Sequence, residues 1–350
     1  MASIDYPRVA VVVVLLAVNL ALVGALTTSS AAYGPYNPDW DGADTLRTTA
    51  SEEADVRLAV STETYTDVPP AGATAFVLAP EAPSEEAAAR VQSFVARGGT
   101  LVVAGEDANA TNGYLDAVGA SARVDGRQVR DDQNNYRAPQ LPVATNVTEH
   151  DLAAGVESLT LNDGTVVEPR GATPLVNTSG VAYVDADGNG TLDATDPFGT
   201  FPVATVEPEG SGRIVTVSDP SVFTNAMLDR AGNEAFLRAL LNGQSTVLVD
   251  YSHRSSLPPL VYALLAVRAS PPLQAAVGVA AFGILALYAN RRRIAASLPE
   301  READRAVDVT LDEAAVRALL ADEHPDWERE RVERVTEAVL RQHGTESDND

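Results

Sequence analysis

The chain of 350 residues contains no cysteine and no lysine. Without cysteine there can be no disulfide, no thiolate nucleophile, no iron–sulfur cluster and no cysteine-ligated zinc site. Only four histidines are present, and they are scattered along the chain with no short-range metal-binding pair.

Positive charge is scarce. All 25 basic residues are arginines, against 49 acidic residues, which gives a formal charge of −24. Nucleic acid is a poor partner for such a chain, because binding it needs clustered basic residues. This composition, which is also poor in aromatic residues, is typical of halophilic, archaeal-type proteins. In molar salt the screening length of ~3 Å weakens acidic self-repulsion. An acidic protein from a low-salt environment is the alternative.

Two apolar segments predict transmembrane helices over residues 9–28 and 271–290. Each is long enough to cross the ~30 Å hydrocarbon core of a lipid bilayer. Arg8 precedes the first segment and Arg291–Arg293 follow the second, and positive charge marks the cytoplasmic side of a membrane. We therefore expect a two-pass protein of the cell membrane with both termini in the cytoplasm. A cleaved signal peptide is the alternative for the first segment.

This topology divides the chain into six segments. They are a cytoplasmic N-terminus (1–8), a transmembrane helix (9–28), an extracellular domain (30–256), an interfacial segment (257–270), a second transmembrane helix (271–290) and an acidic, helical cytoplasmic tail (291–350).

The large middle segment alternates between strand and helix patterns. Residues 75–79 and 100–104 are short apolar runs rich in β-formers. Between them, residues 84–97 form an amphipathic helix that Ser84 can cap and two glycines end. Strand, helix and strand within about 30 residues indicate a βαβ unit and a parallel sheet. We expect an α/β fold, a Rossmann-like sandwich with a mainly parallel sheet.

The pattern continues toward the end of this segment. Residues 213–217 and 246–250 predict two further strands, with a helix over about 233–241 between them. The region 121–205 is less regular and predicts loops and hairpins. In the tail, Thr310 begins a capping box for one helix and Pro325 begins a second helix.

Several short motifs together resemble the DUF4350 family of archaeal and bacterial membrane proteins. They are YNPDWDG (37–42 with the preceding Tyr36), the paired glycines of VARGGTLVVA, HDLAAGV (150–156), SDPSVFTN (218–225) and DYSH (250–253). The resemblance implies an external domain similar to class I glutamine amidotransferases. It also implies a MoxR-type ATPase and a DUF58 protein as partners, which we expect the tail to dock. Amidotransferase chemistry itself is excluded, because it needs a cysteine nucleophile.

A calcium-binding loop is the sharpest local motif. Oxygen ligands occur at positions 1, 3, 5, 7, 9 and 12 of a twelve-residue loop, with glycine at position 6. The predicted ligands are Asp185, Asp187, Asn189, Thr191, Asp193 and Asp196. Asp196 replaces the usual glutamate, and the flanks read as strands instead of helices. A structural Ca²⁺ site is our interpretation, and an acidic turn without a metal is the alternative.

Polar residues also follow two of the predicted strands, at the sheet edge where α/β proteins bind ligands. We expect them to line a ligand-binding cleft, and they are Asp219, Ser221, Asn225, Asp250 and His253. A Ser221–His253–Asp250 triad would make the protein a serine hydrolase. The alternative is that these groups cap turns and helices. Three sequons, at Asn109, Asn146 and Asn177, predict glycosylation if the domain is external.

The sequence thus favours a non-catalytic binding or scaffold protein, anchored in the membrane and not an enzyme. A surface serine hydrolase and a solute-binding receptor are the alternatives.

Overall fold

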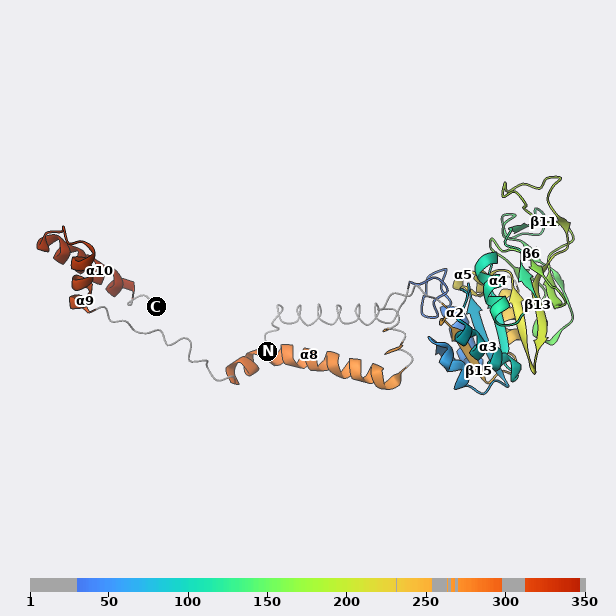
Figure 1. Cartoon of the computed structure of the whole chain (residues 1–350), viewed down its shortest axis with the longest axis horizontal. Coiled ribbons are helices and arrows are strands. Elements are labelled where there is room, and N and C mark those ends of the chain that lie inside the picture. Colours follow the sequence, from blue (N-terminus) through green and yellow to red (C-terminus); the bar gives the residue numbers. More distant parts are fainter. Residues whose placement is uncertain are drawn as a thin grey trace, which may run out of the picture. The chain divides into compact units, whose positions relative to one another are not determined.

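The computed structural model describes residues 30–230, 232–253, 263, 266–267, 270–297 and 312–346. The chain divides into two compact units, residues 1–279 and 280–350. The first unit contains the α/β domain, and the second contains the helices of the tail (Figure 1).

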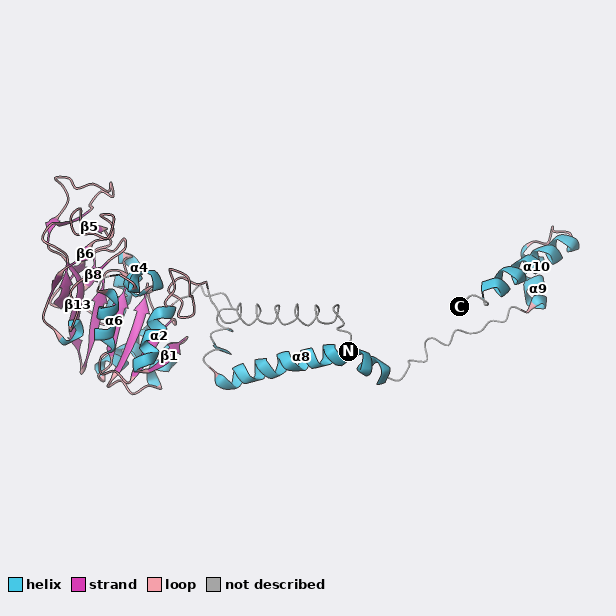
Figure 2. Cartoon of the chain, turned by 180° about the vertical axis from the view of Figure 1, so that it is seen from behind, coloured by secondary structure: helices cyan, strands magenta, loops and turns pink. Residues whose placement is uncertain are grey.

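An eight-stranded sheet forms the centre of the α/β domain (Figure 2). In spatial order its strands are β1 (Asp55–Ala59), β15 (Thr246–Asp250), β2 (Ala73–Leu78), β3 (Thr100–Ala104), β14 (Gly212–Val217), β13 (Pro202–Glu209), β10 (Thr173–Asn177) and β7 (Asn146–Val147). The first five strands pair in parallel, and the last three join the sheet antiparallel. Every residue of β2 and β3 is buried, as expected for strands covered on both faces.

Helices cover both faces of the parallel strands. One apolar cluster joins one face to α3 and α4, through Val91, Phe94 and Leu115. A larger cluster joins the other face to α2 and α6, through Leu46 and Phe236. The helices of this unit are α2 (Asp44–Glu53), α3 (Glu85–Ala96), α4 (Ala108–Ala117), α5 (Asn225–Leu228) and α6 (Asn233–Leu241).

Short strands between β3 and β14, and three 3₁₀ turns, complete the domain. They are β4 (Arg123–Val124) with β9 (Val167–Glu168), β6 (Val143–Ala144) with β8 (Leu159–Thr160), and β5 (Val129–Arg130) with β11 (Ala182–Val184) and β12 (Phe198–Gly199). The 3₁₀ turns are η1 (Thr62–Thr66), η2 (Asp151–Ala153) and η3 (Pro220–Phe223).

The predicted βαβ unit is confirmed. β2, α3 and β3 follow one another, and β2 pairs with β3 in parallel. The Ser84 hydroxyl accepts the Ala87 N–H at 3.3 Å, which makes Ser84 the expected N-cap. The fold is therefore mixed α/β, with a parallel half that the local patterns predict and an antiparallel half that they leave open.

The tail contains two helices, α9 (Glu313–Glu323) and α10 (Arg329–Glu346). Asp312 caps α9 by accepting the Ala314 N–H at 3.2 Å, whereas the predicted cap, Thr310, lies outside the described residues. α10 begins at Arg329, four residues after the predicted start at Pro325. In the connection between the helices, the rings of His324 and Trp327 stack with their centroids 4.1 Å apart.

The prediction of two membrane-spanning helices is wrong. Within the described part of the chain, no helix combines the length and the apolar character that crossing a bilayer requires. α8 (Pro271–Ser297) carries Gln274 in its first turn, and Arg291–Arg293 continue the helix instead of flanking it. The predicted location, a two-pass membrane protein with its main domain outside the cell, is therefore wrong as well.

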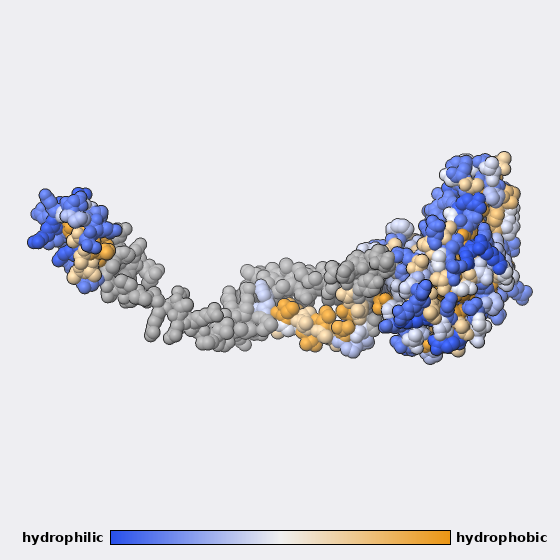
Figure 3. Space-filling model, in the orientation of Figure 1, coloured by the Kyte–Doolittle hydropathy of each residue, from blue (hydrophilic) through white to orange (hydrophobic). Residues whose placement is uncertain are grey.

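Other parts of the predicted topology are not described. The first predicted span, 9–28, and nearly all of the segment 257–270 lie outside the described residues. α8 itself exposes apolar side chains, including Val279, Phe282 and Ile284 (Figure 3).

Candidate functional site

Two carboxylates follow neighbouring parallel strands at the edge of the sheet where those strands end. Glu106 comes two residues after β3, and Asp219 comes two residues after β14. Asp219 has no exposed surface. One of its oxygens accepts the Ser221 N–H at 2.7 Å and the other accepts the Asn162 N–H at 2.6 Å. Both oxygens therefore hold backbone in place.

The loop of residues 162–165 covers this edge of the sheet. Besides the bond from Asn162 to Asp219, the Thr165 N–H donates to the Ser218 carbonyl at 3.1 Å. A Cβ added at Gly164 would lie 2.9 Å from the Cβ of Asp219. The loop thus lies against the carboxylate so closely that glycine is required at 164, and it occupies the place where α/β proteins commonly bind ligands.

The burial of these acids affects their titration. Burial raises the pKa of Asp219 to about 6, although the hydrogen bonds from Asn162 and Ser221 lower it. Burial also raises the pKa of Glu106 to about 7, and the neighbouring charges of Asp219, Asp163 and Asp107 raise it further. Burial at this edge thus favours the protonated forms of Glu106 and Asp219.

A second polar group follows β15. Although burial alone would raise the pKa of Asp250, the neighbouring His253 and hydrogen bonds from Tyr65 and Ser252 hold that pKa below its usual value. The Tyr65 hydroxyl donates to Asp250 at 2.5 Å. His253 Nε2 donates to the Leu78 carbonyl at 3.1 Å, while Nδ1 lies 3.9 Å from Asp250. Burial, with the charge of Asp250 second, raises the pKa of Tyr65.

The five predicted cleft residues do not meet at one place. Asp250 and His253 follow β15, whereas Ser221 follows β14, and β2 and β3 lie between these strands. Three strand spacings amount to about 14 Å. The buried Ser221 hydroxyl has no hydrogen-bond partner. Asn225 instead ties down the segment before α2, because it accepts the Thr45 N–H at 2.8 Å and donates to the Asn37 carbonyl.

The predicted calcium loop brings three carboxylates together. One oxygen each of Asp185, Asp187 and Asp196 lie within 4.8 Å of one another. Asp185 and Asp196 are buried, and Gly190, at the sixth position, has φ of +80°. Arg130 Nε lies 3.0 Å from Asp185 and supplies the local positive charge.

Hydrogen bonds within this loop already use most of its oxygens. Asp185 accepts the N–H groups of Asn189 and Gly190, at 3.1 and 2.9 Å. The Asn189 side-chain oxygen accepts from the Thr191 N–H and hydroxyl, and Asp193 accepts from Thr195 in the same way. The residues fit a calcium loop at positions 1, 3 and 12, whereas Asn189 and Asp193 are engaged with their neighbours.

The predicted sequons lie at different places in the fold. Asn109 is in the first turn of α4, Asn146 is in β7, and Asn177 is in β10, where its side chain donates to the Asn146 carbonyl at 3.3 Å. Glycosylation at these residues stays a prediction.

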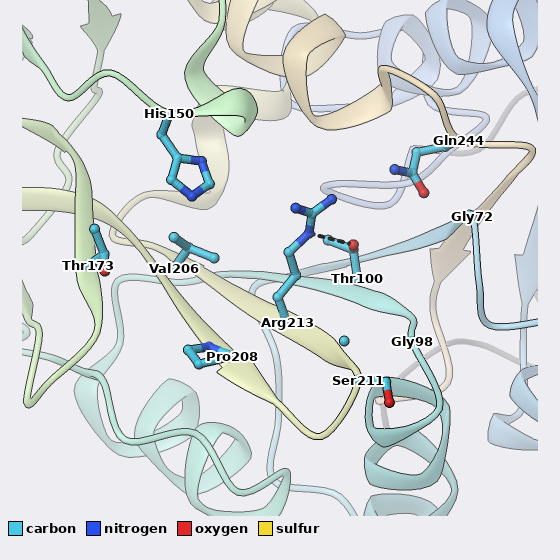
Figure 4. A pocket seen from close by; sticks show the side chains of 11 residues that line it. Gly72, Gly98, Thr100, His150, Thr173, Val206, Pro208, Ser211, Arg213 and Gln244 are labelled. Carbon is cyan, nitrogen blue, oxygen red and sulfur yellow. Dashed lines mark hydrogen bonds between the residues drawn. The ribbon is translucent and has the colours of Figure 1, made fainter.

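The sequence analysis missed a cavity at the opposite edge of the sheet. A hollow of about 440 Å³ lies where β3 and β14 begin, and His150 and Arg213 point into it (Figure 4). Both residues occur in stretches that the sequence analysis singled out, HDLAAGV and the strand 213–217. A histidine and an arginine in an acidic chain could have drawn attention to a binding site. However, 63 positions separate the two residues, so the sequence did not indicate that they meet.

The buried carboxyl of Asp219 makes stability depend on pH. Its folded-state pKa of about 6 exceeds its ordinary 3.8, so the folded protein keeps this proton longer as pH rises. The free energy of unfolding of the wild type therefore falls as pH rises from about 4 to about 6. Asp219→Asn has no carboxyl to titrate at this position. Its free energy of unfolding, relative to that of wild type, should therefore rise by about 3 kcal/mol between pH 4 and pH 7.

Urea unfolding at fixed salt, repeated across this pH range, measures the difference. Asp67→Asn, at an exposed position, is the matched control and should run parallel to wild type. A parallel curve for Asp219→Asn would show that Asp219 titrates at its ordinary pKa.

A comparison with curated proteins finds no match to the chain. Among solved structures, the mmIFT52 N-terminal domain is 14% identical with a TM-score of 0.44, over 57% of this chain and 88% of that one. A cytoplasmic protein from Salmonella typhimurium LT2 is 14% identical with a TM-score of 0.33, over 57% and 84%. A β-galactosidase from the Antarctic haloarchaeon Halorubrum lacusprofundi is 17% identical with a TM-score of 0.30, over 48% of this chain but only 21% of its own.

These likenesses are too distant to bear on activity, and they do not support an amidotransferase-like domain. The resemblance to DUF4350 is confirmed, since the family described as "Domain of unknown function (DUF4350)" matches residues 35–241. The chain belongs to the DUF4350 family.

Proposed function

We propose that the α/β domain is a non-catalytic binding domain of a scaffold protein. The observation that carries this proposal is the state of the sheet edge where the parallel strands end. There, both oxygens of Asp219 accept backbone N–H groups, His253 donates to the Leu78 carbonyl, and the loop of residues 162–165 covers the end of β14. These groups act as structural acceptors and donors.

A serine hydrolase needs its nucleophile within hydrogen-bond reach of a base, about 2.6–3.2 Å. The Ser221 hydroxyl has no such partner, and two strands separate it from His253. The alternative hydrolase thus lacks the pair of groups that would activate its nucleophile. The cavity at the other edge of the sheet supports binding instead.

An assay of ester and peptide hydrolysis tests this proposal. Wild type and Ser221→Ala should show the same rate, equal to the background without protein. Ser218→Ala is the matched control, because its buried hydroxyl also lacks a partner. Turnover by wild type that disappears in Ser221→Ala but persists in Ser218→Ala would refute the proposal.

We propose further that Ca²⁺ binds the loop of residues 185–196 and stabilises it. The three converging carboxylates and the positive φ of Gly190 support this. Ca²⁺ would add positive charge beside Asp185, which already forms an ion pair with Arg130. The role of the ion is structural, because the loop lies on a hairpin between β11 and β12.

Calcium should therefore raise the melting temperature at fixed salt. At a free concentration a hundred times the Kd the gain is about 2.7 kcal/mol, or roughly 5–10 °C for a domain of this size. Asp187→Asn should abolish this gain, whereas Asp67→Asn should keep it. Equal melting temperatures of wild type with calcium and with chelator would refute the site.

The tail is proposed to dock a MoxR-type ATPase, alone or with a DUF58 protein. α9 and α10 pack through Val316 and Val332, both buried, while Leu319 leaves 65% of its surface exposed. An exposed leucine on a short helix is a suitable anchor for a partner.

Co-purification of the ATPase with the full chain tests this docking. Leu319→Asp should reduce capture at least tenfold. Ala318→Asp adds the same charge one residue away and should leave capture intact. Equal capture by both variants would show that this face of α9 is not the docking surface.

A further inference from the structure

The cavity at the edge where the parallel strands begin differs from the rest of this acidic protein. Of its 11 lining residues, none is aspartate or glutamate. They are Gly72, Gly98, Thr100, His150, Thr173, Val206, Pro208, Ser211, Gly212, Arg213 and Gln244. A cavity of about 440 Å³ falls within the range of small-molecule sites, about 300–1,000 Å³.

A tight turn between β13 and β14 positions Arg213. Glu209 pairs with Gly212, so the turn consists of Gly210 and Ser211. Gly210 has φ of +58°, and a Cβ at Gly212 would come within 2.2 Å of the Val95 and Gly99 carbonyl oxygens. This close approach fixes the start of β14 against the end of α3, and Arg213 is the next residue.

The guanidinium of Arg213 retains most of its hydrogen-bonding capacity. Its Nε donates to the Thr100 hydroxyl at 3.1 Å, which orients the side chain into the cavity (Figure 4). No carboxylate in the described part of the chain lies within ion-pair distance of this arginine, although acids outnumber arginines 49 to 25. The remaining N–H groups form the planar fork that matches a carboxylate or a phosphate.

His150 presents a donor to the same space. Its Nδ1 accepts the Leu152 N–H at 3.1 Å at the start of η2. Because Nδ1 accepts, the proton of the neutral ring lies on Nε2, the atom at the free end of the ring. Figure 4 shows this ring and the Arg213 guanidinium pointing into one hollow. Thr173 and Ser211 add hydroxyl groups to its wall.

We propose that this cavity binds a small ligand through an oxyanion, a carboxylate or a phosphate, held by Arg213 and His150. The inference rests on the proposed binding function and names its site and ligand class. In molar salt the screening length of ~3 Å weakens the repulsion between the net negative charge of the protein and a bound anion. The hydroxyl-bearing wall suits a ligand with hydroxyl groups next to the anion.

Calorimetric titration of the full chain with three matched probes, at one fixed concentration of potassium chloride, tests the site. Glycerol 3-phosphate and glycerate carry the two oxyanions, and glycerol carries none. We expect one or both anions to bind and glycerol not to bind. The anion that binds identifies the source of the negative group.

Variants then assign the binding to the cavity. Arg213→Gln should weaken it at least tenfold. Arg97→Gln is the matched control for charge, since Arg97 is exposed and donates to the Ser93 carbonyl outside the cavity wall. His150→Asn keeps an acceptor for the Leu152 N–H but removes the Nε2 donor, so it should weaken binding without loss of folding. If Arg213→Gln fails to fold, His150→Asn decides the question alone.

Three results would overturn the inference: no binding of either anion, equal binding of glycerol, or anion binding that persists in His150→Asn and Arg213→Gln. These results would not bear on the separate proposal that the protein does not hydrolyse esters or peptides. Conversely, hydrolysis that depends on Ser221 would refute the proposed non-catalytic function even if anions bind at Arg213.

Discussion

The buried carboxyl of Asp219 organises the edge of the sheet where β14 ends. It receives one backbone N–H from η3 and one from the loop of residues 162–165, so a single side chain joins the end of β14 to the loop above it. An acid buried without a positive partner is costly unless its oxygens are hydrogen-bonded or protonated. Here both oxygens are hydrogen-bonded, and burial raises the pKa to about 6. The cover over this edge is therefore part of the folded core.

Closing one edge of the sheet changes where a ligand can bind. In open α/β sheets the crevice lies outside the carboxyl ends of the strands. Here the loop of residues 162–165 covers the end of β14, and the cavity that holds Arg213 lies at the opposite end of β3 and β14. The antiparallel partner β13 makes this possible, because its hairpin with β14 places Arg213 one residue beyond the pair Glu209–Gly212 that closes the turn. The antiparallel strand β13 thus occurs together with a cavity at the edge of the sheet opposite to the usual binding edge.

Local patterns predicted the parallel half of the fold because its signals are local. Apolar runs, the Ser84 cap and the paired glycines determine β2, α3 and β3 within about 30 residues. The antiparallel half depends on pairings such as β10 with β13 and β10 with β7, between short strands with weak patterns. The membrane prediction rested on the apolar character of two segments, and no helix of the described residues has the length and apolar character needed to cross a bilayer.

The candidate sites show the same division between local and distant information. The calcium loop is contiguous, so its spacing alone brought Asp185, Asp187 and Asp196 together. Asp219 and Ser221 follow β14 and Asp250 ends β15, but a common site also depends on the strand order, which inserts β2 and β3 between Ser221 and His253. Arg213 and His150 meet only through the sheet's antiparallel extension and η2. A site assembled from separate elements depends on topology, and topology is the information that residue patterns carry least.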